Sequence, residues 1–315
     1  MTTKEAAFNS SVVSALERGE IKQAQEATTS YTRTGIFEAS FISNILPKET
    51  VTDDQLMDTT DESVAMLYEK QPQSGPAKWV PFGTMPNGKY ITSSKYVIPA
   101  AELQTEEYKK NINELRTTKM PIQSFLSDDM IRRGVEMTDH KWVGTCNQIL
   151  DDSDANGIQR ETGKRQIISF ADSINRTTWA DAKKLMLQGS TYKGMEHMYR
   201  MRTSCALMNE ATAQEFTKLD RNQYGGDGAQ KNFEEGLTQD SFGGVKLVYT
   251  IKDNIVPDNW VYFFTAPQFL GHYYEVKGWT TFMELRGTAL SFFSYWIGGC
   301  GIGNIAGVQL AKFNQ

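Results

Sequence analysis

The chain has 315 residues, of which 39% are hydrophobic and 23% are charged, so it can bury a substantial core and can form more than one domain. Its formal net charge of -5 argues against a protein that mainly binds nucleic acid, because such proteins carry a surplus of basic side chains. The three cysteines are few and far apart, which indicates buried free thiols in a reducing compartment. The N-terminal sequence has no apolar run of signal-peptide length, which predicts a protein that stays in the cytoplasm where it is made.

Two N-terminal segments are predicted to pack onto other surfaces. Residues 3–27 carry helix-forming residues with a loose apolar stripe, which is typical of a short amphipathic arm. Phe37–Leu46 is apolar enough to dock, and Pro47 ends it. The first segment has too little apolar surface to form a domain of its own.

A lysine-rich segment over residues 70–101 predicts a long two-stranded arm. The segment contains no acidic residue, whereas residues 49–69 before it are rich in Asp and Glu, and Asn87-Gly88 indicates a hairpin turn. An isolated hairpin is marginally stable in water, so we expect the arm to lie on the acidic surface of a neighbouring copy; a surface loop is the alternative. The expected contact residues are Lys78, Trp79, Phe82, Lys89, Tyr90 and Lys95.

The segment Ser124–Ile149 predicts the longest helix of the chain. Ser127 provides a helix start with two aspartates in the first turn, and apolar residues from Met130 to Ile149 form an approximate helical stripe. We expect the helix to end in the polar sequence DDSDANG, residues 151–157.

Helices and strands alternate from Ile167 to Phe242, which indicates an α+β region. Helices are predicted over Trp179–Gln188 and Glu210–Leu219, and Asn209 caps the second of them. Cys205–Met208 reads as a buried strand, and a glycine-rich loop follows at Tyr224–Ala229. From Val245 onwards strands dominate, with the sequences VKLVYTI, WVYFFTA, LGHYYEV, Trp279–Leu285 and the C-terminal segment.

The C-terminal segment contains five glycines, and three interpretations compete for it. A membrane span over Thr288–Ala311 is disfavoured, because glycines weaken a helix and the aromatic residues favour strands. Gly301-x-Gly303-x-x-Ala306 matches a dinucleotide-binding pattern, but only nine residues follow Ala306, too few for the helix and strand that such a site requires. Strands with bulges or bends at the glycines are the preferred interpretation.

The residues predict no catalytic, cofactor or metal site. The run Asp152-x-Asp154-x-Asn156-Gly157 matches the first half of a calcium loop, but its twelfth position is Gly163 instead of an acid. The three histidines, His140, His197 and His272, are scattered, and none forms a zinc-ligand spacing with a cysteine.

Four segments, taken in chain order, carry a family resemblance. They are the hairpin around VPFGTMPNGKYI, the long helix after SFLSDD, the strand-then-helix element TSCALMNEATAQEFTKL, and the run IVPDNWVYFFTAPQFLG. Together they resemble the major capsid protein of tailed double-stranded DNA phages, which has the Hong Kong ninety-seven type fold. The resemblance covers nearly the whole chain as an order of elements, without a short signature motif.

The resemblance implies an α+β fold with four parts. Residues 1–48 would be the N-terminal arm, and residues 49–118 the extended loop, with its hairpin at 70–101, and flanking strands. Residues 119–160 with 272–300 would form a peripheral domain built on the long spine helix, and residues 161–271 with 301–315 an axial domain. The extended loop would reach across an adjacent subunit, Gly298–Gly303 would return the chain to the axial domain, and a loop in the axial domain would face the capsomer centre. Its residues are Tyr224, Gly225, Gly226 and Asp227.

The function that the resemblance implies is self-assembly into hexamers and pentamers of an icosahedral shell around phage DNA. The main partner would be the protein itself, with portal, scaffold and decoration proteins as further classes, DNA only through non-specific contact, and no membrane and no cofactor. The protein would be assembled in the host cytoplasm and end in the virion. Two alternatives stay open: an encapsulin-type compartment shell and a soluble two-domain α+β enzyme.

Overall fold

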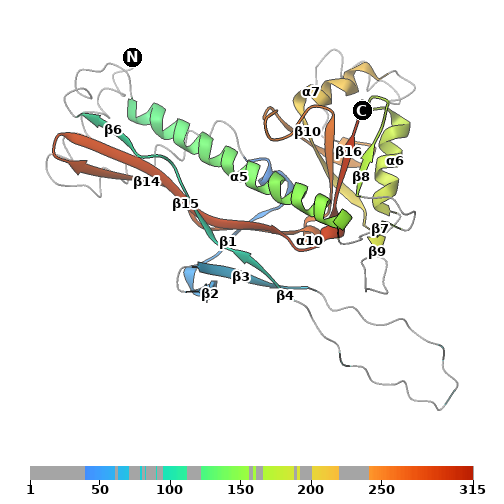
Figure 1. Ribbon diagram of the computed structural model, residues 1–315, viewed down its shortest axis with the longest axis horizontal. Helices are drawn as coiled ribbons and strands as arrows, with labels where there is room; N and C mark the ends of the chain where they lie inside the picture. Colours follow the sequence, from blue (N-terminus) through green and yellow to red (C-terminus); the bar gives the residue numbers. More distant parts are fainter. Residues whose placement is uncertain are drawn as a thin grey trace.

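The computed structural model describes residues 40–60, 63–70, 79, 82, 90, 95–111, 122–155, 159–160, 166–187, 190–191, 201–219 and 241–314. Within these residues the fold is mixed α+β, as predicted. A five-stranded sheet runs along one long helix, a six-stranded sheet lies at one end of that helix, and a smaller ribbon leads away from the body (Figure 1).

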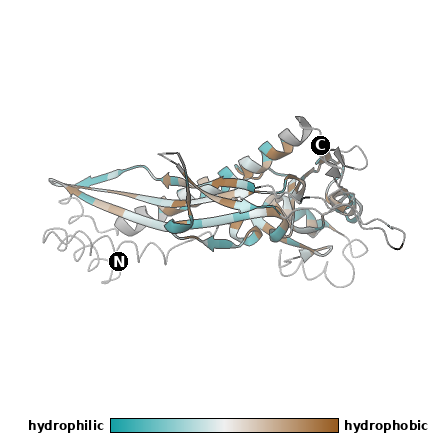
Figure 2. Ribbon diagram, turned by 90° about the horizontal axis from the view of Figure 1, so that it is seen from below, coloured by the Kyte–Doolittle hydropathy of each residue, from teal (hydrophilic) through white to brown (hydrophobic). Residues whose placement is uncertain are grey.

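The five-stranded sheet is built on one long hairpin. Its strands are β1 (Lys48–Thr50), β14 (Gly271–Arg286), β15 (Ala289–Ile302), β5 (Ala101–Gln104) and β6 (Tyr108–Asn111). The sequence predicted two separate strands in place of the single strand β14. The strand is continuous because its pairing with β15 extends through Gly278, with shifts in register on either side of Lys277. Hydrophilic and hydrophobic residues follow one another along the long strands (Figure 2), as expected for a sheet with one covered face.

The long helix is α5 (Ile122–Ala155), which has 34 residues. The buried residues of the predicted stripe, from Met130 to Cys146, face the sheets as expected, although Leu150 is buried in place of Ile149. The prediction that the helix ends in DDSDANG is confirmed, since the last helical residue is Ala155, just before Asn156-Gly157. Asp151–Ala155 still continue the helix, because polar side chains are compatible with its last turns, whereas glycine has a low helix propensity.

The six-stranded sheet is covered on both faces. Its strands, in spatial order, are β11 (Ser241–Phe242), β12 (Val245–Thr250), β10 (Thr203–Asn209), β13 (Trp260–Thr265), β16 (Val308–Lys312) and β8 (Ile167–Ser169). In β10, Leu207 packs into the cluster that contains Trp142 of α5, whereas Met208 packs into the cluster that contains Trp179. This explains why the predicted strand Cys205–Met208 is apolar without alternation.

Short helices complete the fold. They are α3 (Ile42–Ile45), η1 (Asp53–Gln55), α6 (Arg176–Leu187), α7 (Glu210–Ala213), η2 (Gln214–Lys218), α10 (Pro267–Leu270) and η3 (Ile305–Gly307). Asn209 caps α7 as predicted, accepting a hydrogen bond from the Ala211 amide at 3.1 Å. The predicted helix over Glu210–Leu219 is therefore α7 followed by a tighter turn, and α6 starts three residues before the predicted Trp179 because Asn175 caps it.

Two small sheets lie outside the main layers. The ribbon contains β2 (Met57–Thr60), β3 (Ser63–Glu69) and β4 (Lys95–Pro99), and a further pair joins β7 (Gln159–Arg160) to β9 (Ser190–Thr191). The antiparallel pair β3–β4 forms the base of the predicted two-stranded arm. The predicted turn at Asn87-Gly88 lies outside the described residues.

Two glycines of α5 provide a matched test of this packing. A Cβ atom at Gly134 would lie 1.9 Å from Cη2 of Trp279 in β14, whereas a Cβ at exposed Gly144 would meet nothing within 4 Å. We expect Gly134→Ala to lower the free energy of unfolding by about 1–3 kcal/mol through overpacking. Gly144→Ala should raise it by up to about 1 kcal/mol, because alanine has the higher helix propensity. Urea unfolding of both variants measures the difference, and equal effects would contradict the packing described here.

Candidate functional site

The described aromatic residues of the arm are fully exposed to solvent. Trp79, Phe82 and Tyr90 have relative exposures of 104%, 111% and 102%. Lys95 pairs with Glu69 at 3.0 Å, where the described ribbon ends. Lys78 and Lys89 lie outside the described residues, as do Tyr224, Gly225, Gly226 and Asp227. Three large aromatic side chains thus lie in solvent instead of packing against their own subunit.

The base of the arm is fixed to the body by a cluster of rings. Tyr68 of β3 stacks on His272 of β14 with ring centroids 3.9 Å apart, and Tyr96 of β4 stacks on Tyr68 at 5.7 Å. Glu49 of β1 accepts a hydrogen bond from the Tyr68 hydroxyl at 3.2 Å and lies 2.8 Å from His272 Nδ1. Burial and the nearby Glu49 carboxylate raise the pKa of Tyr96 to about 12, so this phenol is neutral at physiological pH.

The glycines of β15 allow the arm base to lie directly on the sheet. A Cβ at Gly299 would come within 2.7 Å of the Pro99 carbonyl oxygen, and one at Gly301 within 2.8 Å of the Ile98 side chain. Gly303, just beyond the strand, meets the ring of Tyr96 in the same way. We call Gly299, Gly301 and Gly303 the glycine track. The expectation that the chain bends at Gly298–Gly303 was wrong, because β15 stays paired with β14 as far as Ile302. The chain passes to the other sheet only after Ile302.

A cavity of about 350 Å³ lies between α5 and the sheet. Met137 and Lys141 line it from the helix, while Leu103 of β5 and Trp296 and Cys300 of β15 line it from the sheet. Trp296 is held in place by the hydrogen bond that its Nε1 donates to Glu275 at 2.8 Å. Glu102 also lines the cavity, and its exposed carboxylate accepts a hydrogen bond from Gln104 at 2.7 Å.

Cys300 is the accessible thiol among the three cysteines. Cys146 and Cys205 are buried, whereas Cys300 is partly exposed at the cavity. Burial raises the pKa of the Cys300 thiol to about 11, against the smaller opposing effect of the Lys141 ammonium. This thiol is therefore mostly protonated at neutral pH, so it is labelled slowly by thiol reagents and can report on access to the cavity.

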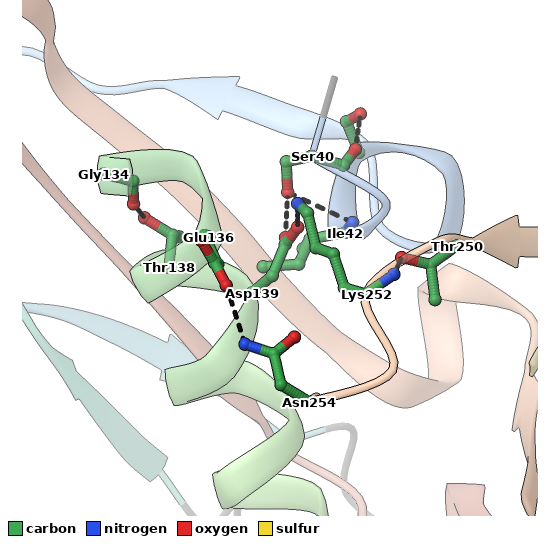
Figure 3. A network of polar contacts seen from close by, with 10 residues as sticks. Ser40, Ile42, Gly134, Glu136, Thr138, Asp139, Thr250, Lys252 and Asn254 are labelled. Atoms are coloured by element: carbon green, nitrogen blue, oxygen red, sulfur yellow. Dashed lines mark hydrogen bonds and ion pairs between the residues drawn. The ribbon is translucent and has the colours of Figure 1, made fainter. Parts of the chain in front are cut away.

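A buried ion pair joins the two sheets to the N-terminal segment (Figure 3). Asp139 of α5 is fully buried and lies 2.7 Å from the ammonium of Lys252, which follows β12 and is only 8% exposed. The Ser40 hydroxyl donates to the second oxygen of Asp139 at 2.5 Å. Burial raises the pKa of the Asp139 carboxyl, although Lys252 and Ser40 oppose that shift by stabilising the charged form.

Neighbouring contacts extend this junction. Asn254 donates to Glu136 of α5 at 2.7 Å, and Tyr262 of β13 donates to Asn147 of α5 at 2.8 Å. Phe41 packs edge-on against Trp142, consistent with the predicted docking of the segment that ends at Leu46. The sequence analysis missed the ion pair because its members are 113 residues apart, and a single Asp on the buried flank of α5 was the only signal.

The other motifs noted in the sequence form neither a metal site nor a His–Cys pair among the residues that the structure describes. Asp152 and Asp154 lie in the last turn of α5, where a helical backbone does not wrap an ion, and Asn156 lies outside the described residues. His140 is exposed on α5 while Cys146 is buried. Among the residues that the structure describes, no three His, Cys, Asp or Glu side chains gather as metal ligands. The described helices include none long and apolar enough to cross a membrane.

The ion pair leads to a stability prediction. Asp139→Asn leaves the Lys252 ammonium buried without a counter-charge, so we expect it to lower the free energy of unfolding by about 3–5 kcal/mol. Replacing both members, Asp139→Leu with Lys252→Met, removes the desolvation cost together with the attraction and should leave stability unchanged or raise it by about 1–4 kcal/mol. Urea denaturation tests both. If Asp139→Asn is as stable as the native protein, Asp139 does not compensate the buried charge of Lys252.

Comparisons with known proteins rest on structure alone. No protein-family model matches the sequence, and no curated protein matches it at a significant level. The capsid of the cyanophage P-SCSP1u matches with a TM-score of 0.60 at 12% identity, over 88% of this chain and 88% of that one. The capsid of a native GTA particle matches with a TM-score of 0.54 at 12% identity, over 89% of this chain and 92% of that one. The mature capsid of bacteriophage PhiM1 matches with a TM-score of 0.52 at 11% identity, over 88% of this chain and 87% of that one.

These matches extend over most of this chain and most of each capsid chain. They confirm the predicted resemblance at the level of the fold. At such low identities the likeness concerns the arrangement of the backbone. The chain therefore has the fold of the major capsid proteins of tailed phages.

Proposed function

We propose that the protein is the major capsid protein of a tailed double-stranded DNA phage. Copies of it assemble in the host cytoplasm into hexamers and pentamers, which form the icosahedral shell of the virion. The observation that carries this proposal is the exposure of Trp79, Phe82 and Tyr90 on an arm whose base is rigidly held. Such side chains are normally buried, and a second copy of the chain supplies the missing surface.

Assembly follows from many modest contacts between identical chains. A standard protein interface buries about 800 Å² on each partner, and a subunit with several neighbours multiplies that gain. The arm carries lysines without acids up to residue 101, so it is attracted to an acidic neighbour surface. The net charge of -5 suits a container that holds DNA through non-specific contacts only.

The proposal assigns the two main sheets to the two domains of a capsid subunit. The paired strands β14 and β15 with α5 belong to the peripheral domain, residues 119–160 and 272–300, whereas β1, β5 and β6 of the same sheet come from the segments that precede it. The six-stranded sheet belongs to the axial domain, residues 161–271 and 301–315. The glycine-rich loop at Tyr224–Asp227 then lies at the capsomer centre. Portal, scaffold and decoration proteins are the further partner classes, and the proposed role is structural, without a cofactor or catalysis.

Electron microscopy of the purified protein tests the proposal directly. We expect closed shells of uniform size, because heterologous contacts that close on themselves generate capsomers and then a shell. Compact oligomers with a defined small number of subunits would contradict it and favour the enzyme alternative. Nuclease-resistant DNA inside particles purified from lysed host cells separates a phage capsid from an encapsulin, whose particles would hold protein cargo instead.

The charge of the arm provides a second test. Lys78→Glu combined with Lys89→Glu should impair shell formation, because it turns attraction to an acidic neighbour into repulsion. The far-ultraviolet circular dichroism of the subunit should stay native, since neither residue lies in an element of the described fold. Lys78→Arg with Lys89→Arg keeps the charge and should assemble normally. Normal shells from the glutamate variant would remove the electrostatic role of the arm.

A further inference from the structure

The cavity between α5 and β15 has the properties of a receptor for one large side chain. Its volume of about 350 Å³ falls in the range of about 300–1,000 Å³ that is typical of small-ligand pockets. Its walls are mainly apolar, with Leu103 and the buried Trp296 on the sheet side and Met137 on the helix side. Met137 is 55% exposed, so part of this apolar surface meets solvent.

Among the residues that the structure describes, Trp79 is the largest of the fully exposed hydrophobic side chains. An indole buries about 150–250 Å² on contact and contributes more than Phe or Tyr to protein interfaces. Trp79 is fully exposed and follows Lys78 directly in the sequence. The cavity carries the exposed carboxylate of Glu102 on its sheet side and the ammonium of Lys141 on its helix side, so a lysine next to a bound indole is complemented only on the sheet side.

We propose that this cavity receives Trp79 from the arm of a second copy of the chain, with Lys78 of that copy beside Glu102. The inference rests on the proposed function and specifies which surface of the neighbour holds the arm. The aromatic ring would lie between Met137 and Leu103, and would cover the thiol of Cys300.

The geometry favours a second copy over the arm of the same subunit. Ala101, which lines the cavity, lies two residues after Pro99, the last residue of β4. Lys95, the first residue of β4, lies about 13 Å from Pro99 along the strand. Strand β4 packs on Gly299 and Gly301 of β15, whereas Cys300 between them faces the opposite side of the sheet, toward the cavity. Trp79 belongs to the connection that leaves β3 at Glu69 and returns at Lys95, so the arm of the same subunit starts on the face of the sheet that is opposite to the cavity.

A peptide experiment tests the cavity without requiring assembly. The probe is the ten-residue peptide of residues 75–84, GPAKWVPFGT, added to dilute protein that is treated with a maleimide and analysed by mass spectrometry. We expect the peptide, at about ten times its Kd, to slow labelling of Cys300 about tenfold. The same peptide with alanine in place of tryptophan should not protect. Cys146 and Cys205 are buried and serve as internal controls for unfolding.

Two methionine variants provide matched controls. Met137→Glu places a charge in the cavity and should abolish the protection by the peptide. Met57→Glu adds the same charge at a methionine that is 53% exposed on β2, away from the cavity, and should leave the protection unchanged. Circular dichroism confirms that both variants are folded.

Labelling of the full-length protein distinguishes the possible occupants. Protection of Cys300 that rises with protein concentration and disappears in Trp79→Ala supports the proposal. Protection that is independent of concentration and needs Trp79 identifies the arm of the same subunit and overturns it. Protection that survives Trp79→Ala identifies another occupant, such as residues 1–39, and also overturns it. Shells in which Cys300 reacts as fast as in dilute protein would refute the role of the cavity and leave the proposed function intact. Protection of Cys300 by the peptide in a protein that forms no shells would support the cavity and contradict the proposed function.

Discussion

The organisation of this protein depends on aromatic side chains that their own subunit leaves in water. Burying a side chain the size of phenylalanine contributes about 1.5–3 kcal/mol, and the arm exposes three such residues, Trp79, Phe82 and Tyr90. In a monomer these side chains stay in water, and the proposed association of subunits would bury them. The arm can act in this way only if its base is rigid, because a freely moving arm would lose more conformational entropy on docking.

The rigidity of the base has two sources. The glycine track removes the side chains that would hold β4 away from β15, so that Ile98 and Tyr96 lie directly on the strand. The stacked rings of Tyr68 and His272 then fix β3 to β14, and the Tyr274 hydroxyl donates to the Ile98 carbonyl at 2.9 Å. Glycines that resembled a nucleotide-binding pattern therefore serve close packing of backbone against backbone.

The Asp139–Lys252 pair has a different role, because it connects parts of the molecule that no strand joins. Asp139 belongs to the helix along the five-stranded sheet, Lys252 to the six-stranded sheet, and Ser40 to the start of the described chain. Buried charges contribute little net stability but tolerate few alternative arrangements. The pair and the Ser40 hydrogen bond therefore connect the start of the described chain to the long helix and to the loop after β12.

The sequence by itself determined three local elements: α5 from its apolar stripe, the strand at Cys205–Met208 from its apolar run, and the cap at Asn209. Each of these is encoded in residues that are close in the chain. Only the tertiary structure decided that β14 continues through Gly278, that Asp139 pairs with Lys252, and that a cavity opens beside Met137. Those features depend on contacts between residues far apart in sequence, and local periodicity carries no information about which distant side chain will fill a given space.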